Sequence, residues 1–199
     1  MLILGETLKN NSQENVMEID KRIKEVVFSA EEIKNKIIEL SHWVNETYKT
    51  SDNLVIVGLL KGSLPFLAEL IKHLNVDHVI DFIVASSYFG KTKSSGNIKI
   101  VMDLNYDIYQ KDILIIEDII DSGITLDRIK TNLLERKPRS LKIMTLLDKP
   151  YKRKVNLNAD VYGFQAPDEF LVGFGLDVKE KLRNLPYVGI FDKKYLNKL

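Results

Sequence analysis

A cluster of acidic and small polar residues near the middle of the chain has the composition of a binding site. The segment Ile113–Thr125 begins as an apolar run, passes through Glu117, Asp118 and Asp121, and ends in a short turn rich in hydroxyl groups. Ionised carboxylates only accept hydrogen bonds, so beside a phosphate Glu117 and Asp118 would bind sugar hydroxyls or a hard cation such as Mg²⁺. Asp121 is left as a candidate proton acceptor.

The turn that follows these acids has the features of a phosphate cradle. Backbone N–H groups would face outward at a helix N-terminus, and the hydroxyls of Ser122 and Thr125 would add donors. Gly123 would permit a strained φ angle and a close approach to the ligand. A phosphate cradle beside two acids describes a ribose 5-phosphate site. The alternative is an ordinary capped helix, with Ser122 or Asp121 as the N-cap.

The surrounding apolar pattern places these residues at one edge of a parallel sheet. Ile113 to Ile116 form an apolar run without alternation, which predicts a buried strand that ends before the two acids. The spacing of Leu126, Ile129 and Leu133 predicts a helix. Because open α/β folds bind ligands at the carboxyl ends of their strands, we expect the site at that edge.

Other segments complete an alternation of strands and helices. A capping box at Ser29 and Glu32 predicts a helix to about Tyr48, with Ile33, Ile37, Leu40 and Val44 as its buried stripe. A helix is expected over 64–74, and further strands are expected over 54–60, 79–86, 98–104 and 141–147. This order predicts an α/β fold with a parallel sheet.

The segment Glu117–Thr125 resembles the phosphoribosyl pyrophosphate (PRPP) signature of type I phosphoribosyltransferases, in the form of the hypoxanthine-guanine branch. Further landmarks of that family follow in order from about Val26 to Phe191. The resemblance implies the type I phosphoribosyltransferase fold, in which helices flank a central parallel sheet and a small hood covers its carboxyl edge. It also implies a PRPP-binding set made of Glu117, Asp118, Asp121, Ser122, Gly123, Ile124 and Thr125.

A second turn at the same edge suits pyrophosphate. Lys61 and Gly62 follow the apolar run Leu54–Leu60, so a turn there would expose backbone N–H groups and a cation. By resemblance, Lys61, Gly62 and Arg183 bind pyrophosphate, and the peptide bond before Lys61 is cis. An ordinary strand–helix turn with an exposed lysine is the alternative.

The polar segment 86–96 is similar to the mobile catalytic loop of the family. Its glycine, serine and lysine content argues against stable packing. Ser87 and Tyr88 match a pair that reaches over the pyrophosphate when the loop closes and excludes water. A plain hairpin loop is the alternative.

The residues that recognise the base have counterparts in the last quarter of the chain. By resemblance, Lys149 donates to O6 of a 6-oxopurine, Phe170 stacks on the base and the backbone of Leu171 reads its edge. Asp177 matches an acid linked to Mg²⁺, so the implied metal ligands are Glu117, Asp118 and Asp177. The neighbouring Lys152, Arg153 and Lys154 fit a solvated face, and we expect no role for them.

Composition limits the class of protein. The 199 residues suffice for one domain, with a core over about 26–154 and a hood mainly over about 155–199 plus N-terminal residues. A net charge of +1 and the lack of a ~20-residue apolar stretch predict neither nucleic-acid nor membrane binding. The absence of cysteine fits the cytoplasm. By resemblance, the protein is a homo-oligomer, either a dimer or a tetramer.

These features favour a 6-oxopurine phosphoribosyltransferase. It would convert PRPP and hypoxanthine or guanine into the nucleoside 5′-monophosphate and pyrophosphate, with Mg²⁺ as cofactor and Asp121 accepting the N7 proton. Asp121 and Lys149 are the candidate catalytic residues. Three alternatives remain: a preference for xanthine, a nucleotide-binding regulator that also binds a macromolecule such as RNA, and a phosphotransferase with an aspartyl nucleophile.

Overall fold

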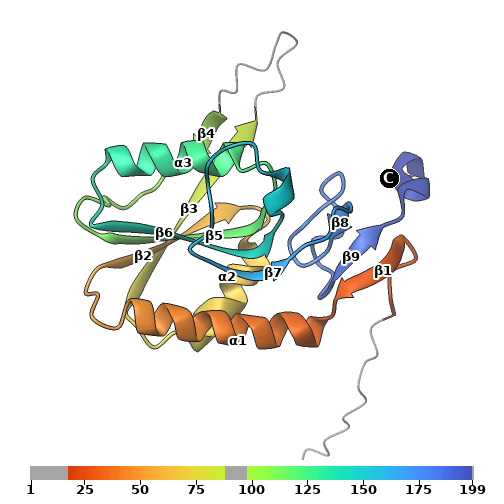
Figure 1. The fold of residues 1–199 in the computed structure, drawn as a ribbon, viewed down its shortest axis with the longest axis horizontal. Coiled ribbons are helices and arrows are strands. Elements are labelled where there is room, and N and C mark those ends of the chain that lie inside the picture. Colours follow the sequence, from red (N-terminus) through yellow and green to blue (C-terminus); the bar gives the residue numbers. More distant parts are fainter. Residues whose placement is uncertain (1–17, 88–97, 199) are drawn as a thin grey trace, which may run out of the picture.

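Two β-sheets of different size organise the chain. The structure, a computed structural model, describes residues 18–87 and 98–198. Its larger sheet has six strands in the order β4-β3-β2-β5-β6-β7, and its smaller sheet has three in the order β1-β9-β8 (Figure 1). In the described ranges no helix is both long and apolar enough to span a membrane.

The larger sheet is mostly parallel, as the sequence predicts. Strands β3, β2, β5, β6 and β7 run parallel, and only the edge strand β4 is antiparallel. Unbroken apolar runs fit its central strands because helices cover both faces. The bounds are His78–Ser87 for β3, Ile98–Met102 for β4, Leu54–Leu60 for β2, Asp112–Ile120 for β5, Ser140–Asp148 for β6 and Val161–Gln165 for β7.

Helices cover the two faces of this sheet. Figure 1 shows α3 (Ile124–Glu135) on one side, with α1 (Ala30–Thr47) and α2 (Leu64–Leu70) on the other. The short 3-10 helices are Ile71–His73, which extends α2, Pro150–Lys152 and Lys193–Lys198. The predicted capping box is present, since Glu32 N–H donates to Ser29 Oγ and Ser29 N–H donates to the Glu32 carboxylate. The predicted apolar stripe of α1 is buried in the core.

Strand β5 includes Glu117 and Asp118, whereas the sequence predicts that the strand ends before these two acids. Pairing with β6 runs on to Ile120 and Asp148, so Glu117 and Asp118 lie inside the strand and the prediction of its end was wrong. The backbone ladder of β6 satisfies the main chain here whatever the side chains are.

The small sheet is built from both ends of the chain. It pairs β1 (Ile23–Phe28) with β9 (Val188–Phe191) and β9 with the short β8 (Leu171–Val172), and we call it the hood. A separate apolar cluster stabilises it, with Val172 and Phe191 among its buried members. The boundary expected near residue 155 does not follow the sheets, because β7 pairs with β6 in the larger sheet.

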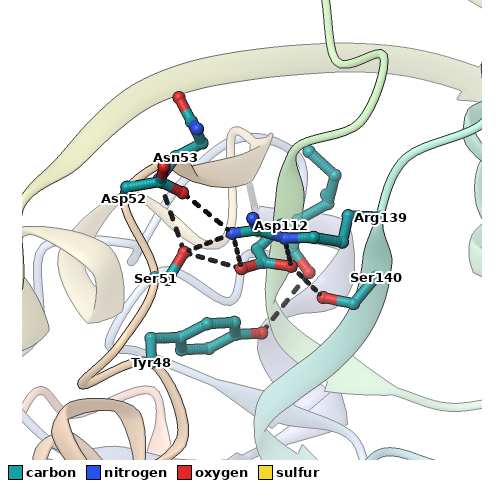
Figure 2. A network of polar contacts seen from close by, with 8 residues as sticks. Tyr48, Ser51, Asp52, Asn53, Asp112, Arg139 and Ser140 are labelled. Carbon is teal, nitrogen blue, oxygen red and sulfur yellow. Dashed lines mark hydrogen bonds and ion pairs between the residues drawn. The ribbon is translucent and has the colours of Figure 1, made fainter.

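A polar cluster lies at the amino ends of β5 and β6. Asp112 accepts hydrogen bonds from Ser51 Oγ at 2.6 Å, Ser140 Oγ at 2.7 Å and Arg139 Nη2 at 2.7 Å (Figure 2). The guanidinium of Arg139 and these hydroxyls lower the pKa of Asp112 to about 2, against the opposing effect of burial. The cluster ties together the chain segments that enter three neighbouring strands.

Candidate active site

The loop between β5 and α3 has the backbone that the sequence predicts. Gly123 has φ +76° and is the N-cap of α3, and no side chain caps the helix. The alternative of a Ser122 or Asp121 side-chain cap is therefore wrong. An added Cβ on Gly123 would also lie 2.9 Å from Arg153 Cδ, so a larger residue would be strained on both counts.

This loop forms one wall of an open cavity of about 280 Å³. Glu117, Asp118 and Thr125 all contribute to this wall. Asp121 is exposed, and Ile124 is not among the lining residues. The lining residues are Glu117, Asp118, Ile119, Ile120, Asp121, Ser122, Gly123, Thr125 and Leu126. The predicted acids and turn thus share one concave surface.

The Lys61–Gly62 turn lies against Asp118. The Leu60–Lys61 peptide bond is cis, as the family resemblance implies. A Cβ added to Gly62 would lie 1.8 Å from Asp118 Oδ2, so only glycine leaves room for this carboxylate. Asp118 Oδ1 accepts a hydrogen bond from Ile119 N–H at 2.8 Å, which fixes its orientation. The second predicted turn therefore joins the first at the same sheet edge.

The two strand acids perturb each other. Burial and the neighbouring Asp118 carboxylate raise the pKa of Glu117 well above its usual range. Such a pair gains from a cation, and Mg²⁺ commonly takes one or two protein carboxylates and completes its shell with substrate oxygens and water. The donor set at Glu117 and Asp118 fits that use.

Asp177 does not join this pair. Its carboxylate pairs with Arg183 Nη2 at 2.8 Å and accepts a hydrogen bond from Glu180 N–H at 2.8 Å. Within residues 18–87 and 98–198 no three acidic or histidine side chains gather as a metal site. Asp177 therefore does not join Glu117 and Asp118 in the set of metal ligands that the resemblance implies.

The cations expected to bind pyrophosphate are brought together by a residue that the sequence did not single out. Glu180 Oε2 lies 3.0 Å from Lys61 Nζ and 3.2 Å from Arg183 Nη2. Arg183 Nη1 also donates to Gly175 O at 2.7 Å. Gly175 has φ +98°, and an added Cβ would lie 1.9 Å from Gly62 O. The loop that follows β8 and contains Gly175 therefore packs closely against the Lys61–Gly62 turn.

Residues that the sequence predicts to recognise the base also lie close together. Lys149 is 6% exposed, and its Nζ donates to Glu169 O at 2.7 Å. Burial lowers the pKa of Lys149, and the nearby charge of Asp121 opposes this effect. Phe170 is 45% exposed and rests edge-on against Phe191, with ring centroids 5.9 Å apart, so a ring face is open to a ligand. Leu171 is buried in β8.

Comparison with known proteins identifies the family. A family model described as "Phosphoribosyl transferase domain" matches residues 27–179. The chain belongs to the phosphoribosyltransferase family. It is 49% identical to a hypoxanthine-guanine phosphoribosyltransferase of Lactococcus lactis, over 90% of this chain and 97% of the relative. It is 48% identical to a hypoxanthine phosphoribosyltransferase of Escherichia coli, over 83% and 93% of the two chains.

Solved structures carry the same fold. A hypoxanthine phosphoribosyltransferase from Staphylococcus aureus matches with a TM-score of 0.83 at 46% identity, over 87% of this chain and 94% of that one. One from Trypanosoma cruzi matches with a TM-score of 0.85 at 31% identity, over 91% and 97%. The predicted type I phosphoribosyltransferase fold is therefore confirmed.

The predicted mobile-loop pair lies at the edge of the described residues. Ser87 is the last residue of β3, and Tyr88 lies outside the described residues.

The prediction of a solvated face for the basic residues 152–154 is correct for two of the three. Lys152 and Lys154 are exposed as expected, but the Arg153 side chain is 9% exposed and pairs with Asp148. Burial of a guanidinium requires a charged partner, and an acid at the end of β6 was the available signal.

Proposed function

We propose that the protein transfers the 5-phosphoribosyl group of PRPP to N9 of hypoxanthine or guanine and releases pyrophosphate. The observation that carries this proposal is the convergence of three chain segments at one sheet edge. Asp118 of β5 precedes the loop Asp121–Thr125, which we call the phosphate loop, and contacts the Gly62 turn. Lys149 lies beside the same loop and contacts the segment before Phe170 through Glu169 O. The names of the relatives support this substrate pair.

The phosphate loop would bind the 5-phosphate of PRPP. Backbone N–H groups from Asp121 to Thr125, with Ile124 beginning α3, and the hydroxyls of Ser122 and Thr125 supply the donors. Glu117 and Asp118 would hold the ribose hydroxyls or a Mg²⁺ ion beside them. That ion would supply positive charge to the departing pyrophosphate.

The pyrophosphate would lie over the Lys61–Gly62 turn. Lys61 and Arg183 both pair with the carboxylate of Glu180. Two cations around one anionic group suit a ligand with several anionic oxygens. By the family resemblance, Ser87 and Tyr88 would cover this group. These donors stabilise the negative charge that develops as the bond to C1′ lengthens.

The base would lie between the phosphate loop and the hood. Phe170 would stack on it, the backbone of Leu171 and Asp177 would read its edge, and Lys149 would donate to O6. Asp121 would accept the N7 proton as N9 attacks C1′, since the purine becomes more acidic as the new bond forms. The charge of Asp121 acts on the pKa of Lys149, and this proximity supports roles for both groups beside one base.

The direct test measures pyrophosphate release from PRPP with hypoxanthine, guanine, xanthine and adenine in turn. Release with hypoxanthine or guanine, and far less with adenine, is the expected result. Fastest release with xanthine would favour the xanthine-preferring alternative. Nucleotide binding with no release for any base would overturn the proposal in favour of a regulator.

We also infer that the protein is a cytoplasmic homo-oligomer, either a dimer or a tetramer. Its described surface carries exposed large apolar side chains on β4, Val101 at 59% and Met102 at 41% exposure, and exposed apolar groups of this kind are commonly used in interfaces. Light scattering coupled to gel filtration would detect the oligomer, and a monomer at micromolar concentration would contradict this inference.

A further inference from the structure

Three successive carbonyl groups at the start of the phosphate loop are held by one neighbouring segment, residues 149–154. The three hydrogen bonds are Lys149 N–H to Ile120 O at 3.0 Å, Arg153 Nη1 to Asp121 O at 2.6 Å, and Lys154 N–H to Ser122 O at 2.9 Å. The next carbonyl, that of Gly123, accepts from Asp127 N–H at 2.8 Å and belongs to α3. Each of the four carbonyl groups from Ile120 to Gly123 therefore accepts a hydrogen bond.

This arrangement determines where the loop N–H groups point. In a trans peptide unit the N–H is directed away from the preceding C=O, and among the described residues only Leu60–Lys61 is cis. Holding the carbonyls of Ile120, Asp121 and Ser122 toward the neighbouring segment thus turns the N–H groups of the next three residues the opposite way. Successive N–H groups with a common direction form an anion-binding nest.

Arg153 is the one side chain among these three donors. Its guanidinium also pairs with Asp148, and the two side chains are 9% and 12% exposed. Its Cδ packs where a Cβ on Gly123 would stand. Asp148 is in turn fixed at the end of β6, where its carbonyl accepts from Ala166 N–H at 2.8 Å. Arg153 therefore connects the sheet to the loop.

We infer that Arg153 is a positioning residue for PRPP, anchored by Asp148, which orients the Asp121–Ser122 peptide so that its N–H faces the 5-phosphate. This inference rests on the proposed function, because it names the phosphate of PRPP as the ligand. Loss of the guanidinium would leave the Asp121 carbonyl free to rotate and the Asp148 carboxylate buried without its partner. The change would weaken binding of PRPP rather than of the base, because Lys149 and the hood are the groups proposed to bind the base.

The test compares Arg153→Met and Arg153→Lys with the wild-type protein. We expect Arg153→Met to raise KM for PRPP about tenfold or more, the usual effect of losing a charged hydrogen bond, while KM for hypoxanthine changes less than about twofold. Arg153→Lys should recover part of the loss, since one ammonium group can satisfy either Asp148 or the Asp121 carbonyl but not both in the same geometry.

Arg139→Met is the matched control, because Arg139 also pairs with a largely buried aspartate, Asp112, at the opposite edge of the sheet. It should lower thermal stability without raising KM for PRPP. An equal change in KM for PRPP in the two methionine variants would overturn the inference. Should Arg153→Met fail to fold, Asp148→Asn tests the same anchor, and an unchanged KM for PRPP there would also overturn it.

Binding of ribose 5-phosphate, measured by calorimetry, separates this inference from the proposed function. If the wild-type protein binds ribose 5-phosphate but releases no pyrophosphate from PRPP, the proposed reaction fails while the positioning role can still be measured. Arg153→Met should then weaken ribose 5-phosphate binding about tenfold. Equal binding by wild type and Arg153→Met would exclude the positioning role.

Discussion

The ammonium group of Lys61 lies 3.0 Å from the carboxylate of Glu180, which also lies 3.2 Å from Arg183. Hydrogen bonds from these two cations lower the pKa of Glu180, so its carboxylate is ionised at neutral pH. Lys61 and Arg183 are the groups proposed to bind pyrophosphate. In the free protein Glu180 therefore offsets their charge, and a pyrophosphate bound by these two cations would have to displace it.

Replacing Glu180 by glutamine should strengthen pyrophosphate binding. Glu180→Gln removes the competing charge but keeps the size of the side chain, so KM for pyrophosphate in the reverse reaction should fall about two- to fivefold. The effect is small because exposed ion pairs are weak. Glu46→Gln, which breaks the exposed ion pair of Glu46 with Lys49, is the control and should leave this KM unchanged. A rise in KM for pyrophosphate in Glu180→Gln would show that Glu180 supports the site.

Adding one methyl group at Gly62 should disrupt the site. The Cβ of Gly62→Ala would lie 1.8 Å from Asp118 Oδ2, so the carboxylate must move by an ångström or more. Misplacement on this scale costs roughly 100-fold in rate. Ser63→Ala is the neighbouring control, because the Ser63 hydroxyl is buried without a partner and its removal should keep turnover and stability. Steady-state kinetics would check both, and near-normal turnover in Gly62→Ala would contradict the close packing.

The sequence predicts the elements whose signals are local. The capping box at Ser29, the unbroken apolar run of β2 and the glycine at position 123 each reflect short-range physics, and the structure contains all three features. The end of β5 was misplaced because its last hydrogen bonds go to β6, a partner about 30 residues away, and a polar side chain such as Asp118 carries no sign of that pairing.

The site contacts that could not be predicted are all between distant segments. Glu180 approaches Lys61 and Gly175 packs on Gly62 only because the hood folds back over the sheet edge. Arg153 looked like one more exposed cation in a basic run, and its burial depends on where β6 presents Asp148. Such contacts depend on topology, which the local pattern does not encode.

The Asp112 cluster should make the fold acid-sensitive. The pKa of Asp112 is lowered from its ordinary value of 3.8 to about 2, so this group stabilises the folded state above about pH 4 and the contribution is lost as the pH falls toward 2. Asp112→Asn should therefore lower Tm by several degrees at pH 7 and reduce the further loss on going to pH 3. Thermal unfolding measured by circular dichroism at both pH values checks this. Parallel pH dependences in the wild type and Asp112→Asn would contradict it.

Removal of the Asp121 charge should separate binding from turnover. Asp121 is exposed at the mouth of the phosphate loop, and its carbonyl is held by Arg153. Asp121→Asn keeps these backbone contacts but lacks the proton acceptor, so PRPP binding should persist while kcat falls roughly 100-fold or more. Lys154→Gln, an exposed change on the adjacent segment, should leave kcat unaltered. Near-normal turnover in Asp121→Asn would refute the assigned role.

The pH dependence of base binding should report on Lys149. Burial lowers the pKa of its ammonium group, so the cation is lost at a lower pH than from an exposed lysine. Because only the charged form donates strongly to O6, KM for hypoxanthine should rise with pH in the wild-type protein before an ordinary lysine would titrate. Lys149→Met should show a higher KM, less discrimination between hypoxanthine and adenine, and a flatter pH profile.

The ionisation of the base itself is common to all variants and cancels in this comparison. Lys152→Met provides the control, because Lys152 is exposed and its ion pair with Asp168 raises its pKa. Its profile of KM against pH should follow that of the wild type. Profiles of equal slope for wild type and Lys149→Met would mean that the ammonium group does not bind the base, and that Lys149 acts only by supporting the hood through Glu169.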